Sequence, residues 1–262
     1  MRYHSLFKMI AYRLIDIVTL GKGVPVRING FKMKLPTKYF RLFPADYEKL
    51  NFDFFKRNMP QNSVVLDIGA HIGVYSVFFS KGFNAKVFSF EPVPNTLKWL
   101  CKTLDINNCN DLVSVIPSAI SDKAGKARFF ISKTYDVSAA NSLVGYDEGV
   151  IDSRDGSYEV DMISIDEFVK ERAIKPNVLK IDAEGVELQL LKGAAHTFLT
   201  YRPIATLGLH PFAYENKIEI LEEIWNLLES YKMKVLINGE LIQKDTFCYN
   251  EEFLFDVQLI PE

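Results

Sequence analysis

Four polar residues of this 262-residue chain each stand directly after a short apolar run: Asp67, Glu91, Asp182 and His210. If the runs are parallel strands, the four side chains meet at one edge of a sheet, where open α/β sheets bind their ligands. Carboxylates at that edge could bind ammonium and hydroxyl groups. A histidine, which titrates near neutral pH, could move a proton. The spacing therefore predicts a ligand site with acid–base chemistry.

The loop after the first run reads DIGAHIG, from Asp67 to Gly73. Gly69 permits a sharp turn and a close approach of a ligand to the backbone, and Gly73 can begin a helix. The pattern is not GxGxxG, because His71 occupies the place of the second glycine, which a diphosphate requires. The loop therefore favours a ligand without phosphates, whose ammonium group lies near Asp67.

Glu91 lies 24 residues after Asp67 (91 − 67 = 24), at the end of the second apolar run. A carboxylate at this place in a strand–loop–helix–strand unit accepts hydrogen bonds from ribose hydroxyls. The structural alternative for both acids is that they cap turns. We expect a nucleoside ligand, with Glu91 on its ribose.

The hydrophobic pattern predicts the elements that position these residues. Strands are expected at 64–66, 86–90, 112–116, 177–181, 204–209, 234–237 and 252–260, and a hairpin at 126–132 and 158–164 around a polar loop, 133–157. Helices are expected at 73–81, ended by Gly82, and at 94–108, 166–172, 186–191, ended by Gly193, and 218–231. This order predicts an α/β fold with a doubly wound, mostly parallel sheet. The last strands, with no helix between them, suggest an antiparallel partner at the sheet edge.

The N-terminal part, residues 1–58, reads as a helical and extended cap before a main domain at 59–262 that carries the insertion 126–164. Apolar residues at helical spacing between Leu6 and Val18 predict a helix packed on the domain, or alternatively a helix on a membrane surface. No apolar run in this part reaches the roughly 18 residues that span a bilayer. Four aromatic residues of the cap could stack on a sugar, although packing is favoured: Tyr39, Phe40, Phe43 and Tyr47.

Composition narrows the function further. The net charge of −2 gives no indication of nucleic-acid binding. Cys101, Cys109 and Cys248 are odd in number and lack CxxC spacing, which favours reduced thiols and a cytoplasmic location. Asp182, Glu184 and His210 could form a metal site, but we expect no metal, because these residues lack a fixed ligand spacing such as HExxH.

Five segments between Val64 and Ala194 together resemble the FkbM family of class I methyltransferases: VVLDIGAHIGVYSVFFS, KVFSFEPVPNTLKWL, IPSAISDKAG, ISIDEF and VLKIDAEGVELQLLKGA. The combination is specific, whereas each segment alone is a weak signal. The resemblance implies a Rossmann-like sheet of seven strands with an antiparallel last strand. It also implies S-adenosylmethionine as methyl donor, and as acceptor a hydroxyl, often on a sugar, a glycan or a glycoside-like small molecule.

The resemblance also implies roles for single residues. The donor's amino-acid end would lie at Asp67, Gly69, Ala70, His71 and Gly73, its ribose at Glu91 with Asn95 nearby, its adenine at Ser118 and Ala119, and its methyl group beside Asp182 and Glu184. His210 is our first choice as general base, with Asp182 and Glu184 as alternatives; it could also be a core histidine. The family often has a glutamate two residues before this histidine. This chain has Gly208 there, so His210 lacks that expected partner.

Two further interpretations stay open at this point. Lys180 and Asp182 share one face of an ideal strand, so an ion pair between them is favoured over a catalytic role for Lys180. For the whole chain, a nicotinamide-dependent oxidoreductase on the same sheet is disfavoured by the absence of GxGxxG and of a Tyr-x-x-x-Lys pair. The other alternative is a non-catalytic module that only binds the donor.

Overall fold

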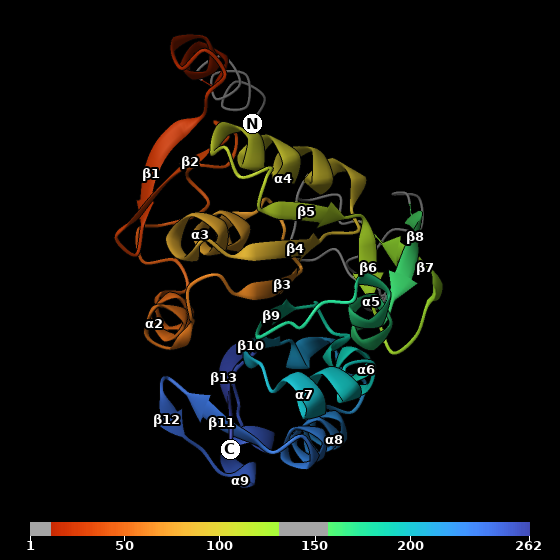
Figure 1. The fold of residues 1–262 in the computed structure, drawn as a ribbon. Coiled ribbons are helices and arrows are strands. Elements are labelled where there is room, and N and C mark those ends of the chain that lie inside the picture. Colours follow the sequence, from red (N-terminus) through yellow and green to blue (C-terminus); the bar gives the residue numbers. More distant parts are fainter. Residues whose placement is uncertain (1–11, 131–156) are drawn as a thin grey trace, which may run out of the picture.

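The computed structural model describes residues 12–130 and 157–262 (Figure 1). Its central sheet has the strand order β12-β11-β13-β10-β9-β3-β4-β5. These strands are β3 (Val64–Ile68), β4 (Lys86–Phe90), β5 (Val113–Ile116), β9 (Val178–Asp182), β10 (Ile204–Leu209), β11 (Met233–Ile237), β12 (Glu240–Leu241) and β13 (Phe255–Pro261). The strands from β10 to β5 run parallel, and β13 is antiparallel to both β10 and β11. The predicted fold class, a mostly parallel α/β sheet of seven strands, is confirmed. The sheet has seven strands of four to seven residues and, in addition, the two-residue strand β12.

The position of the last strand differs from the prediction. β13 lies between β10 and β11 rather than at the edge of the sheet. A short helix, α9 (Lys244–Cys248), also lies between β11 and β13, where no helix was expected. Five residues are too few to show helical periodicity, and strand order depends on contacts between distant segments, so neither feature was readable locally.

Helices cover both faces of the sheet (Figure 1). Neighbouring strand residues point to opposite faces, so Val65 belongs to one core and Leu66 to the other. The core around Val65 contains α2 (Lys49–Asn58), α3 (Val74–Phe83) and α4 (Pro94–Ile106). The core around Leu66 contains α5 (Ile165–Arg172), α6 (Glu187–Lys192), α7 (Ala195–Tyr201) and α8 (Lys217–Ser230). Helix α3 passes through Gly82 and ends where Asn84 adopts a left-handed backbone, so the predicted end at Gly82 is wrong.

The N-terminal segment joins the core around Val65 through α2. Phe52 and Phe55 are fully buried beside the aromatic side chains of α3. Before α2, residues 12–18 are helical, and β1 (Val24–Ile28) pairs with β2 (Phe31–Leu35). Leu14, Ile17 and Val18 are more than half exposed, so the predicted packing of this helix on the domain is wrong for its described part. No helix in the described ranges is long and apolar enough to cross a membrane.

A three-stranded side sheet lies beyond β5. Its strands are β6 (Ser118–Ile120), β7 (Gly125–Phe130) and β8 (Ser157–Ile163). The predicted hairpin is confirmed, because β7 and β8 pair antiparallel. The parallel pairing of β6 with β8 was not predicted. The predicted loop 133–157 lies almost wholly outside the described residues.

Candidate active site

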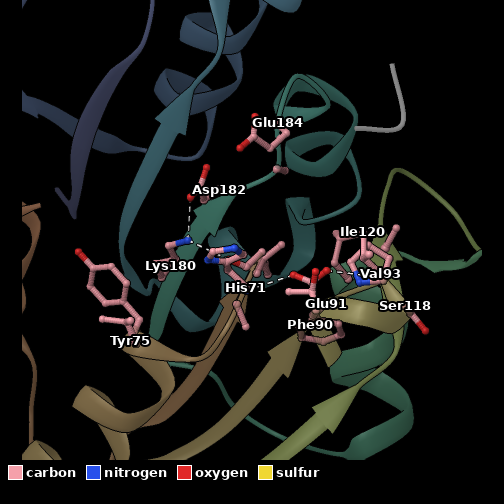
Figure 2. Close-up of a pocket in the computed structure, with 18 of the residues that line it drawn as sticks. His71, Tyr75, Phe90, Glu91, Val93, Ser118, Ile120, Lys180, Asp182 and Glu184 are labelled. Carbon is pink, nitrogen blue, oxygen red and sulfur yellow. Dashed lines mark hydrogen bonds and ion pairs between the residues drawn. The ribbon is translucent and has the colours of Figure 1, made fainter. Parts of the chain in front are cut away.

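A cavity of about 440 Å³ lies at the carboxyl ends of β3, β4 and β9 (Figure 2). Residues 68–71, 90–93, 118–120, 180 and 182–184 line it, together with Leu42, Phe43 and Tyr47 of the N-terminal segment. Glu91 and Ser118 lie toward one end, and Lys180 and Asp182 toward the other (Figure 2). The structure therefore brings Glu91 and Asp182, predicted at the ends of two separate strands, to one cavity.

The glycine loop is fixed between two strands. The backbone N–H groups of Gly69 and Ala70 both donate to the carbonyl oxygen of Phe90, at 3.1 and 2.9 Å. Gly69 has a φ of +71°, and a Cβ atom there would lie 1.9 Å from the carbonyl oxygen of Asp182. Only glycine fits this position, because a side chain would collide with the backbone of β9.

Glu91 is held with both carboxylate oxygens at the cavity. Its Oε1 accepts a hydrogen bond from the Val93 N–H at 3.0 Å, and its Oε2 accepts one from the His71 N–H at 3.1 Å. Each oxygen has a second lone pair, so the carboxylate can accept two more hydrogen bonds. Burial raises the pKa of Glu91 to about 7, although the two N–H donors oppose this shift.

Two residues expected to touch the donor lie behind the cavity wall instead. Asp67 is fully buried, accepts a 2.5 Å hydrogen bond from the Ser76 hydroxyl, and does not line the cavity. Gly73 precedes α3 with a φ of +89°, and a Cβ atom there would meet Leu100 of α4 at 2.6 Å. Both positions support the loop from behind.

Apart from Glu91, three residues were expected near the ribose and the adenine, and two of them line the cavity. Ser118 and Ala119 line the cavity. Asn95 is exposed and does not line it, whereas the buried Thr96 beside it does. The first turn of α4 turns one residue of this pair inward, and a one-residue difference in helix phase is not visible in the sequence.

His71 lines the cavity and has one ring nitrogen without a partner among the described residues. This nitrogen, Nε2, is buried. Burial lowers the pKa of His71 to about 4, helped by the positive charge of Lys180, so the ring is neutral. A neutral, unpartnered ring nitrogen can pair with a polar group of a bound molecule, which makes this cavity suitable for a polar ligand.

Lys180 forms the predicted ion pair and also reaches the cavity. Its Nζ lies 3.0 Å from Asp182 Oδ2 and donates to the carbonyl oxygen of Gly69 at 3.2 Å. Burial opposes the charged form of Lys180, but the charges of Asp182, Asp67 and Glu48 outweigh it and raise the pKa of the ammonium group. Lys180 therefore stays charged and joins the glycine loop to the end of β9.

His210 lies behind two carboxylates at the edge of the cavity. Its Nε2 is 3.4 Å from Asp182 Oδ1 and 3.5 Å from Glu184 Oε2, and its Nδ1 is 2.7 Å from Glu187 Oε1. Gly208 offers His210 no carboxylate, and Glu187 of α6 takes this role instead. A sequence signal existed, since Glu187 follows Asp182 by five residues in the same segment.

The charges of this cluster shift one another. Burial opposes the charged form of His210, but the hydrogen bond and charge of Glu187, then Asp182 and Glu184, raise its pKa to about 9. Burial raises the pKa of Glu184 to about 8, against the opposing charge of His210. Burial also acts to raise the pKa of Asp182, but Lys180 and His210 reverse this and lower it.

Gly208 separates two carboxylates rather than supplying one. It is in register with Asp182 on β9 and with Asp256 on β13. A Cβ atom at Gly208 would lie 3.2 Å from Asp256 Oδ1 and 3.4 Å from Asp182 Oδ1. Burial, then the charges of Glu48 and Asp182, raises the pKa of Asp256 to about 7, and Asn51 donates to its Oδ2 at 2.9 Å. Sequence reasoning missed Asp256, because its place depends on the insertion of β13 next to β10.

Comparisons with known proteins show which family this chain belongs to. A family model described as the methyltransferase FkbM domain matches residues 67–235. The hexuronic acid methyltransferase AglP of Haloferax volcanii is 34% identical over 134 residues, which cover 51% of this chain and 50% of that protein. Methyltransferase sdnD of Sordaria araneosa is 28% identical over 164 residues, covering 52% of this chain and 62% of that protein. The matches thus span between half and two thirds of these relatives.

Among solved structures, a methyltransferase FkbM from Methylobacillus flagellatus has a TM-score of 0.48 and 16% identity to this chain. The similarity covers 76% of this chain and 43% of that one.

Proposed function

Because the chain belongs to the FkbM family of methyltransferases, with S-adenosylmethionine as its methyl donor, we propose that it methylates a hydroxyl group of a sugar or glycan. The observation that carries this proposal is the contact between the donor-sized cavity and the cluster of Asp182, Glu184 and His210. The cavity can hold a nucleoside, and the cluster can accept the proton that the hydroxyl must lose. Family membership removes the oxidoreductase alternative.

The residues that line the cavity fit the donor. Glu91 would accept hydrogen bonds from the two ribose hydroxyls, and Ser118 and Ala119 would border the adenine. Gly69 and Ala70 would let the backbone approach the amino-acid end, where the buried Nε2 of His71 is unpartnered. Asp67 and Gly73 would act indirectly, by holding the loop. When bound, the sulfonium supplies an activated methyl group and leaves as a neutral thioether.

The protein's own part is alignment and proton removal. Holding the acceptor oxygen in line with the methyl group supplies an effective molarity equivalent to about 7–11 kcal/mol in favourable cases. A positioned base contributes a further ~10²–10⁴-fold. Glu184 and Asp182 face the cavity and His210 lies directly behind them, so the proton of the hydroxyl would enter this cluster.

A sugar acceptor is supported by two observations. The relative named as a hexuronic acid methyltransferase is 34% identical to the matched half of this chain. Near the cluster, the rings of Phe212 and Phe253 are stacked at 4.2 Å, and Phe212 lies 5.8 Å from His210. Phe253 is 70% exposed, so an aromatic surface is available for the apolar face of a sugar ring. Tyr39, by contrast, is buried, as the packing interpretation expected.

The test is a transfer assay with methyl-labelled S-adenosylmethionine and a panel of sugars, uronic acids, nucleotide sugars and glycans. We expect a label on one oxygen of one class of acceptor, mapped by NMR. Glu91→Ala should abolish donor binding, whereas Asn95→Ala, exposed on the same segment, should leave it unchanged. Tight donor binding without transfer to any acceptor would instead support the non-catalytic alternative.

A further inference from the structure

The hydrogen bonds of Glu187 fix the orientation and tautomer of His210. Glu187 is fully buried, and its carboxylate accepts from the Gly185 N–H at 2.9 Å and from the Tyr214 hydroxyl at 2.8 Å. His210 Nδ1, at 2.7 Å from the same carboxylate, therefore carries a proton and donates it. The other ring nitrogen, Nε2, is then the one that faces Asp182 and Glu184.

The separations around Nε2 are long for hydrogen bonds but suitable for ligands of one ion. Nε2 lies 3.4 Å from Asp182 Oδ1 and 3.5 Å from Glu184 Oε2, whereas N–H···O bonds are commonly about 2.9–3.0 Å. Two ligands bound tetrahedrally at ~2.1 Å from a metal are about 3.4 Å apart. The two carboxylate oxygens of Asp182 have different partners. Oδ2 accepts a hydrogen bond from Lys180, and Oδ1 is the oxygen near His210.

We propose that Asp182, Glu184 and His210 bind one divalent cation, with Glu187 as the carboxylate that orients the histidine ligand. One ligand atom from each of the three residues lies within 4.8 Å of the others. The long side chain of Glu184 can shorten the widest of these separations. A histidine ligand whose second nitrogen donates to a buried carboxylate is the usual arrangement in metal sites.

The ligand set indicates the class of cation. One imidazole and two carboxylates suit Mn²⁺ or Zn²⁺ better than Mg²⁺ or Ca²⁺, which prefer oxygen ligands only. Three protein ligands leave a position open, as in catalytic rather than structural sites. An acceptor hydroxyl in that position would be polarised and would lose its proton to water more readily. This catalytic use rests on the proposed function, whereas cation binding itself does not.

The sequence allowed a metal site at these three residues but did not predict one, because His210 lies 28 positions after Asp182 (210 − 182 = 28) and no motif spans them. Asp182 is the last residue of β9 and Glu184 lies just after it, whereas His210 directly follows the neighbouring strand β10. Strand pairing therefore assembles the site, and Gly208 leaves room beside it.

The experiment titrates the tag-free, metal-stripped full chain with MnCl₂ followed by electron paramagnetic resonance, and with ZnCl₂ or MgCl₂ followed by calorimetry. We expect one equivalent of Mn²⁺ or Zn²⁺ to bind. Glu184→Gln and His210→Gln should weaken binding by at least tenfold, and Glu187→Gln by about 10–100-fold. Glu215→Gln changes an exposed carboxylate nearby and should have no effect.

S-adenosylhomocysteine binding, measured on each variant, separates loss of the site from loss of folding. The inference is overturned if none of the three cations binds stoichiometrically. It is also overturned if cation binding is unchanged in both Glu184→Gln and His210→Gln. Methyl transfer that persists in EDTA, with no bound cation, would leave the proposed function standing with His210 as the base. Cation binding without transfer to any sugar would leave the metal site standing and remove the proposed acceptor.

Discussion

Glu91 is the residue whose ionisation should be most visible in donor binding. The pKa of its buried carboxyl group is raised to about 7, and its two N–H donors come from the loops that form the cavity. Only the ionised form has the lone pairs to accept both ribose hydroxyls while keeping these two bonds. We therefore expect the charge state of this one side chain to control donor binding.

Donor affinity should therefore fall as the pH falls through 7. Between pH 8 and pH 6 the ionised fraction of Glu91 drops, so we expect S-adenosylhomocysteine to bind about tenfold more weakly at pH 6. Calorimetry at several pH values measures this. Glu91→Gln should bind weakly at every pH, because it cannot titrate. An equal pH dependence in that variant would assign the effect to Glu184 or Asp256 instead.

Gly69 should be far less replaceable than a glycine of similar conformation elsewhere. Gly30 has a φ of +81°, and a Cβ atom there would meet nothing within 4 Å. Gly30→Ala should therefore lower the free energy of unfolding by only about 1–2 kcal/mol, for the left-handed backbone. Gly69→Ala adds a collision with the Asp182 carbonyl oxygen and should cost about 1–3 kcal/mol more. Urea unfolding compares the two. Equal losses would show that the loop yields without moving β9.

His210 should affect turnover and not donor binding. It is 3% exposed and does not line the cavity, but it lies within 3.5 Å of both cavity carboxylates. We expect His210→Ala to lower kcat by ~10²–10⁴-fold at an unchanged affinity for S-adenosylhomocysteine. Normal turnover would remove His210 from the reaction, whether as base or as ligand.

At the scale of elements, the insertion of β13 beside β10 joins the N-terminal segment to the active site. Asn51 of α2 donates to Asp256 Oδ2 at 2.9 Å and accepts from Gln258 Nε2 at 3.2 Å. Both partners lie on β13, and Asp256 faces Gly208 across the strand pair. A helix outside the family match, which begins at residue 67, therefore helps to position the carboxylates next to the cluster.

Asn51→Leu should destabilise the protein, and more at high pH. The substitution removes the partner of Gln258 Nε2 and of Asp256 Oδ2, at a cost of about 1–3 kcal/mol each. The raised pKa of Asp256, about 7, means that the folded state takes up its proton below pH 7. Stability from this group is therefore lost as the pH rises toward 7, and the unpartnered, ionised carboxylate is worst above it.

Urea unfolding at pH 5 and pH 8 tests this dependence. Asn58→Leu, on the exposed side of the same helix, is the matched control and should have little effect at either pH. A loss that is equal at both pH values would mean that Asp256 does not depend on Asn51.

At the scale of the whole molecule, the N-terminal segment and the sheet should unfold together. The expected boundary at residue 58 divides the sequence, but Phe52 and Phe55 of α2 are fully buried against α3. The two cores share the neighbouring strands β10, β9, β3 and β4 of the central sheet, since alternate residues of a strand face opposite sides. We therefore expect one cooperative transition rather than two.

The two tryptophans can report on the two cores separately. Trp99 packs against the core around Val65, and Trp225 against the core around Leu66. The single-tryptophan variants Trp99→Phe and Trp225→Phe should each lose one signal and show one urea midpoint, equal to that seen by circular dichroism of the same variant. Different fluorescence and dichroism midpoints in either variant would show that the N-terminal segment unfolds as a separate unit.

The sequence by itself determined the parallel part of the sheet and the position of the glycine loop after β3. Apolar runs bounded by glycine and acidic residues are local signals, so β3, β4, β9 and β10 were expected near their observed positions, as was the place of Glu91. The fully buried strands read as continuous apolar segments because helices cover both faces. The conformational requirement at Gly69 is also a local property, so it was readable from the residue type alone.

Only the tertiary structure decided which side chains meet. The position of β13, the partner of His210 in Glu187 and the retreat of Asp67 behind the loop depend on pairing between segments far apart in the chain. The same holds for the inward side of α4, where Thr96 rather than Asn95 reaches the cavity. Hydrophobic periodicity specifies which face of an element is buried, but contacts between elements follow from packing the whole chain, which no local pattern encodes.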